Sequence, residues 1–330
     1  MLDSGKAQKI LVVQLGRIGD LILLLPVFEA LKKLNPANEI HLLAGKHNYQ
    51  AVDGHPFIDK VLLYEKSFWG RIKTIIALRK ERYDVWIDPK NHRSGESLLF
   101  ARLGGADFKI GYEASPSVFD FQVPHESEHP DKHISYINLL ALAPFGIDPS
   151  TARPTLFIQG KAEERISEFL QKKRISQYFC VNLSGSRVER NWTTEKWISF
   201  LQQIAKDIPS IVIIAAPAEK ERAIQIAEAV TNAVYLETKS IIEVYSVVKK
   251  ATLVISPDTS IVHIAAAFDK PLLGLYSKNI LNNAKFHPLS TVYEVAMDER
   301  IDLPIAEMSV SLVLENYQKL KKRLQSFEKL

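Results

Sequence analysis

The sequence predicts an α/β protein built from two doubly wound parallel sheets. Short β-rich runs alternate with amphipathic helical runs, and this alternation restarts after an irregular middle section. The length of 330 residues favours two domains at roughly 150 residues each. Alternating strands and helices indicate βαβ units, in which helices cover both faces of a parallel sheet. We expect a deep cleft between the two domains, at the carboxyl ends of their strands, where ligands usually bind.

The two halves repeat the same order of elements. In the first half we predict strands at residues 10–15, 39–43, 60–63 and 85–88, with helices at 21–31, 70–80 and 94–103. In the second half we predict strands at residues 178–183, 211–215, 253–256 and 272–276, with helices at 194–207, 219–230 and 241–249.

The middle and the end of the chain set the domain boundaries. Residues 115–130 carry Pro, Ser, His and Glu without periodicity, and residues 144–154 hold three prolines and a glycine. We therefore expect one domain over residues 1–157 and a second over 158–307. Residues 308–330 form a basic amphipathic helix, which either touches an anionic membrane surface or packs its apolar side on the protein. The second interpretation needs fewer assumptions.

Composition excludes several classes of protein. With 46% hydrophobic and 24% charged residues, the chain has enough apolar material for two cores and is not a disordered or collagen-like sequence. The formal net charge of +4 gives weak steering, so nucleic acid is not an expected partner. The single cysteine, Cys180, suits a reducing compartment. The apolar run at 21–28 is far shorter than the roughly 18 residues of a membrane span, so we expect a cytoplasmic protein.

Asp20 follows the first strand and two glycines, Gly16 and Gly19. One interpretation is that its carboxylate only caps the helix that begins there. The other is that it faces the crevice at the carboxyl end of the strand and acts as a general base. The spacing Gly-x-x-Gly is not a dinucleotide-binding fingerprint.

The loop at residues 182–192 has the composition of an anion-binding loop. Small residues at Ser184, Gly185 and Ser186 let backbone N–H groups approach an oxyanion, and Arg187 and Arg190 supply positive charge. Such a loop suits a phosphate or diphosphate. The alternative is a polar surface turn with solvated arginines.

A third segment, residues 255–267, runs from a strand through a turn into a helix rich in small residues. Asp258, Thr259 or Ser260 would cap that helix, whose N-terminus offers N–H donors to an anion. Because a carboxylate repels phosphate, we expect Asp258 to contact a hydroxyl or a structural donor. His263 lies one turn further on, where a histidine is often simply packed.

Two acidic residues, Glu219 and Glu221, follow another strand of the second half. Either one could accept hydrogen bonds from ribose hydroxyls, or both could only counter the helix dipole. A dedicated metal site is not expected, because Asp84 and Asp88 are too far apart for an Asp-x-Asp motif and Cys180 stands alone. We expect no cofactor.

Taken together, these segments resemble glycosyltransferase family 9, the ADP-heptose:lipopolysaccharide heptosyltransferases. The resemblance spans nearly the whole chain. Its markers are Gly-Arg-Ile-Gly-Asp at 16–20, Tyr-Asp-Val-Trp-Ile-Asp at 83–88, Arg93-Ser94, Lys-Ile-Gly-Tyr at 109–112, the loop at 184–192 and Asp-Thr-Ser-Ile-Val-His at 258–263. It departs from the family at Ser260, where glycine is usual, and at 275–280, which lack the Gly-Pro-Thr turn.

The resemblance implies a GT-B architecture of two Rossmann-like domains. The domain at 1–157 would bind the acceptor, the domain at 158–307 the nucleotide sugar, and the helix at 308–330 would cross back onto the N-terminal domain. Asp20 matches the catalytic base, and Lys90 and Arg93 are expected at the acceptor. The implied donor-binding residues are Ser186, Arg187, Arg190, Glu219, Asp258, Thr259, Ser260 and His263.

The expected reaction is an inverting, metal-independent transfer of heptose from ADP-heptose to a Kdo or heptose of the lipopolysaccharide or lipooligosaccharide core. Its partners would be a nucleotide-sugar donor and a lipid-linked core oligosaccharide, with contact to the cytoplasmic face of the inner membrane. Two alternatives remain open: a GT-B transferase with another nucleotide sugar, and a noncatalytic protein that binds nucleotide sugars.

Overall fold

The computed structural model describes residues 2, 5–90, 92, 94–112, 118–185 and 190–327, and its chain separates into two compact units. The first unit comprises Met1–Phe157 and Ala284–His287, and the second comprises Ile158–Asn283 and Pro288–Leu330. Each unit contains one six-stranded sheet, and the strand pairs among the described residues are parallel. The predicted α/β class with two doubly wound parallel sheets is confirmed.

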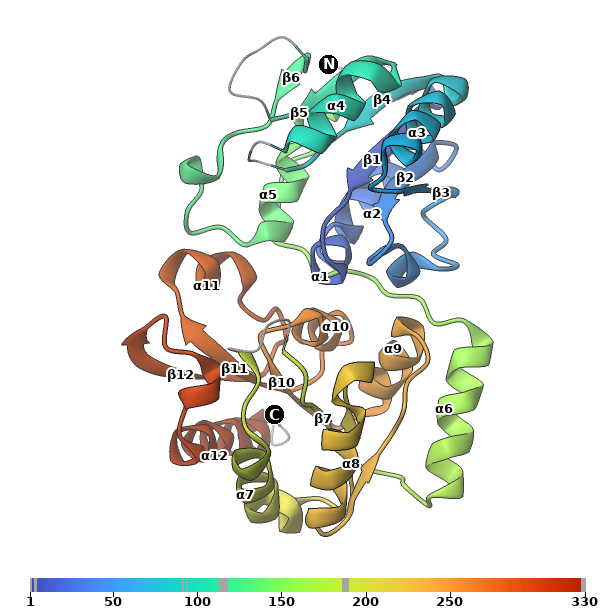
Figure 1. The fold of residues 1–330 in the computed structure, drawn as a ribbon. Helices are drawn as coiled ribbons and strands as arrows, with labels where there is room; N and C mark the ends of the chain where they lie inside the picture. The colour runs from blue at the N-terminus through green and yellow to red at the C-terminus, as the bar shows by residue number, and fades with distance from the viewer. Residues whose placement is uncertain are drawn as a thin grey trace. The chain divides into compact units, whose positions relative to one another are not determined.

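The first sheet has the strand order β3-β2-β1-β4-β5-β6 (Figure 1). Its strands are β1 (Lys9–Gln14), β2 (Glu39–Gly45), β3 (Lys60–Tyr64), β4 (Tyr83–Ile87), β5 (Ala106–Gly111) and β6 (Phe121–Gln122). The helices of the unit are α1 (Ile18–Ile22), α2 (Leu25–Leu34), α3 (Phe68–Glu81), α4 (Gly95–Gly104) and α5 (Ile134–Leu140). The α3 and α4 helices contact each other, and α2 contacts α5.

The second sheet has the equivalent order, β12-β11-β10-β7-β8-β9. Its strands are β7 (Phe179–Asn182), β8 (Ile211–Ile214), β9 (Ala233–Tyr235), β10 (Leu253–Pro257), β11 (Leu272–Lys278) and β12 (Tyr293–Ile301). The helices are α6 (Gly160–Lys172), α7 (Thr194–Ile204), α8 (Lys220–Ala229), α9 (Ile241–Lys250), α10 (Ser260–Ala267), α11 (Ile280–Phe286) and α12 (Val310–Phe327).

Four strands were not predicted from the sequence: β5, β6, β9 and β12. They lie at or next to the edges of the sheets, and most of their residues are only partly buried. A strand that is buried on both faces needs a continuous apolar run, whereas an edge strand does not. The central strands were therefore recognisable, and so was the edge strand β3, which carries the apolar run Val61-Leu62-Leu63.

The first strand of each sheet lies at the point where the chain changes direction. From β1, the chain adds β2 and β3 on one side and then β4, β5 and β6 on the other. From β7, it adds β8 and β9 on one side and β10, β11 and β12 on the other. Loops that follow the strands beside such a switch point diverge and leave room for a ligand at the carboxyl edge of the sheet.

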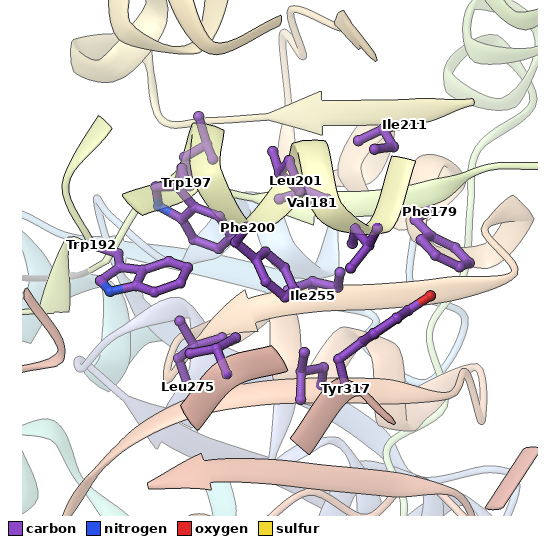
Figure 2. Close-up of a cluster of buried hydrophobic side chains, with 14 of the residues drawn as sticks. Phe179, Val181, Trp192, Trp197, Phe200, Leu201, Ile211, Ile255, Leu275 and Tyr317 are labelled. Carbon is purple, nitrogen blue, oxygen red and sulfur yellow. The ribbon is translucent and has the colours of Figure 1, made fainter. Parts of the chain in front are cut away.

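Aromatic side chains of α7 and the preceding loop fill the core on one face of the second sheet. Figure 2 shows Trp192, Trp197 and Phe200 with Val181 and Ile255. The Trp192 and Trp197 rings meet edge to face, with centroids 5.1 Å apart. The Trp192 indole N–H also donates to the Met308 carbonyl at 2.9 Å, so the loop after β7 is fixed to the chain just before α12.

The terminal helix α12 packs on the second unit, which corrects the expectation that residues 308–330 return to the N-terminal domain. Val313, Tyr317 and Leu320 are buried in the core of the second unit (Figure 2 shows Tyr317). The Tyr317 hydroxyl donates to Asp207 Oδ2 at 2.9 Å, and Lys321 Nζ lies 2.8 Å from the other oxygen of Asp207. The sequence predicts the amphipathic helix correctly, but it does not predict that the second unit covers the apolar face of this helix.

No helix in the described ranges is both long and apolar enough to cross a membrane.

The single cysteine provides a test of the second sheet. Cys180 is fully buried in β7 between β8 and β10, and burial raises the pKa of its thiol to about 12. The thiolate is the reactive form, so we expect a disulfide reagent at about pH 8 to label native protein at least about a hundredfold more slowly than unfolded protein. Absorbance of the released thiol measures the rate.

A Gln203→Cys variant, with its thiol on the exposed side of α7, is the control and reacts without denaturant. Rapid native labelling of Cys180 would contradict the buried central strand.

Candidate functional site

The loop after β1 presents Asp20 at the carboxyl edge of the first sheet. The Arg17 backbone N–H donates to Asp20 Oδ2 at 3.0 Å, so the carboxylate does cap α1, as one interpretation predicted. No described residue bonds its other oxygen, which leaves that oxygen for a second partner. A Cβ at position 16 would lie 2.8 Å from Asp20 Oδ2 and 2.8 Å from Gln14 Oε1, so a side chain there would displace both oxygens from their present positions.

A second carboxylate, Asp88, follows β4 on the other side of the switch point. It is buried and accepts hydrogen bonds from the Ser97 hydroxyl and, at 3.3 Å, from the Lys90 backbone N–H. Burial raises the pKa of Asp88 above its ordinary value. Asp88 therefore organises the turn that carries Lys90. Arg93, the other residue expected at the acceptor, lies outside the described residues.

Asn182 joins the loops that follow β7 and β10. Its side-chain Nδ2 contacts the Ser184 carbonyl and the Ser256 hydroxyl, each at 3.0 Å, and the Thr259 hydroxyl at 3.3 Å. Its Oδ1 accepts the Ser184 N–H at 3.2 Å. The Ser184 hydroxyl in turn accepts the Ala216 N–H at 2.7 Å, which brings in the loop after β8. Three loops at the carboxyl edge of the second sheet are thereby connected.

Arg190 lies against two of these loops. Gly185 allows this approach, because a Cβ there would lie 2.6 Å from Arg190 Cβ. The guanidinium Nη1 donates to the Asp258 carbonyl at 2.9 Å and lies 2.8 Å from Asp258 Oδ2. The expectation that Asp258 contacts a structural donor is thus met by Arg190. Nε and Nη2 of Arg190 have no partner among the described residues, so they are available to a ligand.

The helix α10 begins beside this pair. Thr259 is its N-cap residue and accepts the Ile261 N–H at 3.3 Å. The N–H groups at the start of such a helix, with the helix dipole behind them, form a favourable place for an anion. Ser260 is partly exposed at the first helical position, and His263 is buried one turn later.

Glu219 ends the turn after β8 and pairs with Arg222 at 2.5 Å. Arg222 also donates to the Thr194 hydroxyl at 3.2 Å and to the Trp192 carbonyl, so it fixes Glu219 to the loop after β7. Only one oxygen of Glu219 is used in this pair. Glu221 lies in the first turn of α8, where it counters the helix dipole.

The second unit therefore brings Arg190, Asp258, Thr259 and Ser260 together and connects Glu219 to them through neighbouring loops. Ser186 and Arg187 lie outside the described residues. Three organising residues, Asn182, Asp88 and Arg222, were not predicted from the sequence. The available signal was a polar residue at the end of an apolar run for the first two, and a Glu–Arg spacing of three for the third.

One group of metal-ligand side chains occurs elsewhere in the described ranges. Atoms of Glu39, His41 and Glu81 all lie within 4.8 Å of one another. However, Lys9 Nζ lies 3.2 Å from Glu39 and 2.6 Å from Glu81. Hydrogen bonds from Lys60 and Lys9 lower the pKa of Glu81 to about 2. Lys9 supplies the positive charge that a metal ion would supply. The group lies between the start of β2 and the end of α3, at the sheet edge opposite Asp20.

Comparison with protein families decides the class of this chain. A family model described as glycosyltransferase family 9 (heptosyltransferase) matches residues 71–310, which is more than half of the sequence. The chain belongs to glycosyltransferase family 9. It is therefore a glycosyltransferase, as the sequence resemblance implied.

Relatives within family 9 are distant but extend over almost the whole chain. The lipopolysaccharide core heptosyltransferase OpsX of Haemophilus influenzae is 21% identical, and the alignment covers 93% of this chain and 91% of the relative. The structure of E. coli ADP-heptose lps heptosyltransferase II has a TM-score of 0.76 at 17% identity and covers 96% of this chain and 99% of its own. E. coli heptosyltransferase WaaC with ADP-2-deoxy-2-fluoro heptose has a TM-score of 0.72 at 18% identity, with coverage of 94% and 99%. These likenesses confirm the GT-B fold.

Asn182 offers a test of the site's framework in this family 9 chain. Replacing a buried amide that serves several partners leaves them unsatisfied, so we expect Asn182→Ala to lower the free energy of unfolding by about 1–3 kcal/mol. Denaturation is monitored by tryptophan fluorescence, to which Trp192 and Trp197 of this unit contribute.

The matched control is Gln203→Ala, which removes an exposed side-chain amide with one hydrogen bond on α7. We expect that change to cost less than about 0.5 kcal/mol. An Asn182→Ala protein as stable as this control would show that the three loops do not depend on the Asn182 amide.

Proposed function

We propose that this family 9 chain transfers a heptose from ADP-heptose to a sugar of the lipopolysaccharide or lipooligosaccharide core, a Kdo or another heptose. The donor class is supported by the relatives, since WaaC is known in complex with ADP-2-deoxy-2-fluoro heptose. The acceptor class is supported by the description of OpsX as a lipopolysaccharide core heptosyltransferase. The observation that carries the proposal is that Asp20 and the Arg190–Asp258 pair follow the switch-point strands of their respective sheets.

The second unit is the proposed donor-binding domain. Two nitrogens of Arg190 have no partner among the described residues, and the first N–H groups of α10 are next to Arg190, which suits the two charges of a diphosphate. Ser186 and Arg187 would extend this site. The unpaired oxygen of Glu219 would accept a ribose hydroxyl. Because Asp258 is paired with Arg190, the diphosphate would meet an oriented guanidinium instead of a bare carboxylate.

The first unit is the proposed acceptor-binding domain, with Lys90 and Arg93 near the acceptor. Asp20 would take the proton from an acceptor hydroxyl as its oxygen attacks the anomeric carbon of the donor. In the same step the bond between that carbon and the diphosphate oxygen breaks, and ADP leaves with the electron pair. A single displacement of this kind inverts the anomeric configuration.

Charge on the departing ADP would be stabilised by Arg190, Ser186 and the amides of Thr259 and Ser260. The carboxylates described at this site, Asp258 and Glu219, are each paired with an arginine, which favours stabilisation by the protein over stabilisation by a metal ion.

We expect turnover to be unchanged by a chelator. Loss of turnover that a divalent ion restores would contradict this part of the proposal.

Replacement of Asp20 tests the base. Asp20→Asn keeps an acceptor for the Arg17 N–H and so preserves the cap, but it cannot take a proton at neutral pH. We expect kcat to fall by about 10²–10⁴-fold with ADP-heptose and a core acceptor. Binding of ADP, measured by calorimetry, is expected to stay within about twofold.

The control is Asp53→Asn, an exposed aspartate of the same unit. It should leave both kcat and ADP binding unchanged. If Asp20→Asn turns over at the same rate as Asp53→Asn, the assignment of the base is wrong.

The two alternatives are distinguished by ligand screening. A transferase with another nucleotide sugar would be stabilised by UDP- or GDP-sugars in preference to ADP-heptose, and a noncatalytic binder would be stabilised without turnover. We expect ADP and ADP-heptose to give the largest thermal shifts.

We also expect Arg190→Gln to raise the Kd for ADP at least about tenfold, because a charged hydrogen bond to phosphate is lost.

Arg174→Gln is the matched control for Arg190. Arg174 is exposed and precedes β7, so it lies toward the opposite edge of the same sheet. Equal ADP affinity in the two variants would remove Arg190 from the donor site.

A further inference from the structure

An aromatic pair at the start of α3 is exposed to solvent. Phe68 and Trp69 are 68% and 69% exposed, and their rings meet edge to face with centroids 5.4 Å apart. The other three tryptophans, Trp86, Trp192 and Trp197, are completely buried. Burying a Phe or Trp side chain is worth several times more than burying a small one, so two adjacent exposed rings indicate a contact surface.

The exposed rings belong to a wider face of α3. Gly70, Thr74 and Leu78 are the buried residues of the helix. Trp69 and Ile76, which is 62% exposed, are seven residues or about two turns apart on the opposite side. We call this the α3 face, made of Phe68, Trp69, Lys73, Ile76 and Lys80, together with Lys66 just before the helix.

Positive charge surrounds the apolar side chains of the α3 face. Residues 61–80 contain five lysines and arginines and one acidic residue, so this short segment carries a net charge as large as that of the whole chain. Lys66, Lys73 and Lys80 are exposed, and none forms an ion pair with a described residue. The one carboxylate, Glu65, lies 3.4 Å from Lys46 and is therefore partly neutralised.

Exposed aromatic rings flanked by unpaired lysines are the chemistry of a protein surface that rests on anionic lipid. The rings enter the headgroup region, and lysines near them are attracted to the acidic headgroups. A protein partner of similar affinity would need a larger apolar area, because such interfaces exclude unpaired charges from their centre. The combination of charge and aromatic rings therefore favours a lipid surface.

The terminal helix α12 does not provide an equivalent surface. Its apolar residues Val313, Tyr317 and Leu320 are in the core of the second unit. Lys321 is paired with Asp207 and Arg323 with Glu294, at 2.8 and 2.9 Å. The amphipathic pattern that suggested membrane contact in the sequence is explained by packing.

We propose that the α3 face binds an anionic lipid bilayer, with Phe68 and Trp69 inserted at headgroup level and Lys66, Lys73 and Lys80 contacting acidic headgroups. This surface belongs to the unit proposed to bind the lipid-linked acceptor, but binding to lipid does not depend on the transfer reaction. The test measures binding alone, so its failure leaves the proposed function untouched.

Trp69 is itself the probe, because it is the one exposed tryptophan of the four. Vesicles of phosphatidylcholine with about 30% phosphatidylglycerol should shift the tryptophan emission to shorter wavelength and reduce quenching by acrylamide. Vesicles of phosphatidylcholine alone should bind at least about tenfold more weakly, and about 0.5 M salt should weaken the anionic case. Full binding to neutral vesicles, or no binding to either kind, would overturn the proposal.

Variants then locate the surface by co-sedimentation with the same vesicles. We expect Phe68→Ser/Trp69→Ser and Lys66→Gln/Lys73→Gln/Lys80→Gln each to weaken binding at least about tenfold. These side chains are exposed, and circular dichroism verifies that each variant is folded.

The matched control makes similar changes on α12: Lys319→Gln/Lys322→Gln/Phe327→Ser. It should bind like the unchanged protein. Loss of binding in the α12 control alone would transfer the lipid surface to the terminal helix. A concentration-dependent dimer without lipid, in which Trp69 becomes protected from acrylamide, would instead assign the α3 face to a second copy of the chain.

Discussion

The geometry of the site in the second unit depends on the hydrogen bonds of the Asn182 side-chain amide. Its Nδ2 has two hydrogens and three acceptors within 3.3 Å, so at least one hydrogen is shared. The group is buried, where an unsatisfied acceptor costs about 1–3 kcal/mol. The contact to Thr259 fixes the first residue before α10, and this in turn fixes Asp258 and the guanidinium of Arg190.

The first unit uses a closely similar device. Gln14 is the last residue of β1, as Asn182 is the last residue of β7. Gln14 Oε1 accepts the Gly16 N–H at 2.9 Å, and its carbonyl accepts Asn48 Nδ2 at 2.8 Å. In both units an amide side chain ends the strand at the switch point, and a glycine then allows the loop to fold back closely. Hydrogen bonds of these two amides thus organise the described parts of the loops that carry the proposed base and the proposed phosphate ligand.

Much of this arrangement follows from local sequence, and some of it does not. Central strands are recognisable because burial on both faces demands continuous apolar runs, whereas β9 and β12 lack that demand. The loops after β1, β7 and β10 could be predicted to share sheet edges because parallel strands end together. The pairing of Arg190 with Asp258 joins residues 68 positions apart, and no local pattern reveals it. The contact of Tyr317 with Asp207, 110 positions apart, similarly decided the place of α12.

The effect of charge is even harder to predict from the sequence. It depends on which charged side chains form ion pairs and not on how many charged residues there are. Arg190 is held by Asp258 and Lys321 by Asp207, so one orients a ligand group and the other fastens a helix. On α3, by contrast, the lysines have no carboxylate among the described residues, and they stand beside exposed aromatic rings. A paired cation contributes to structure and an unpaired one is free to attract a partner. A net charge of +4 on the whole chain therefore conceals three different roles for basic residues, which only the positions of the acidic side chains separate.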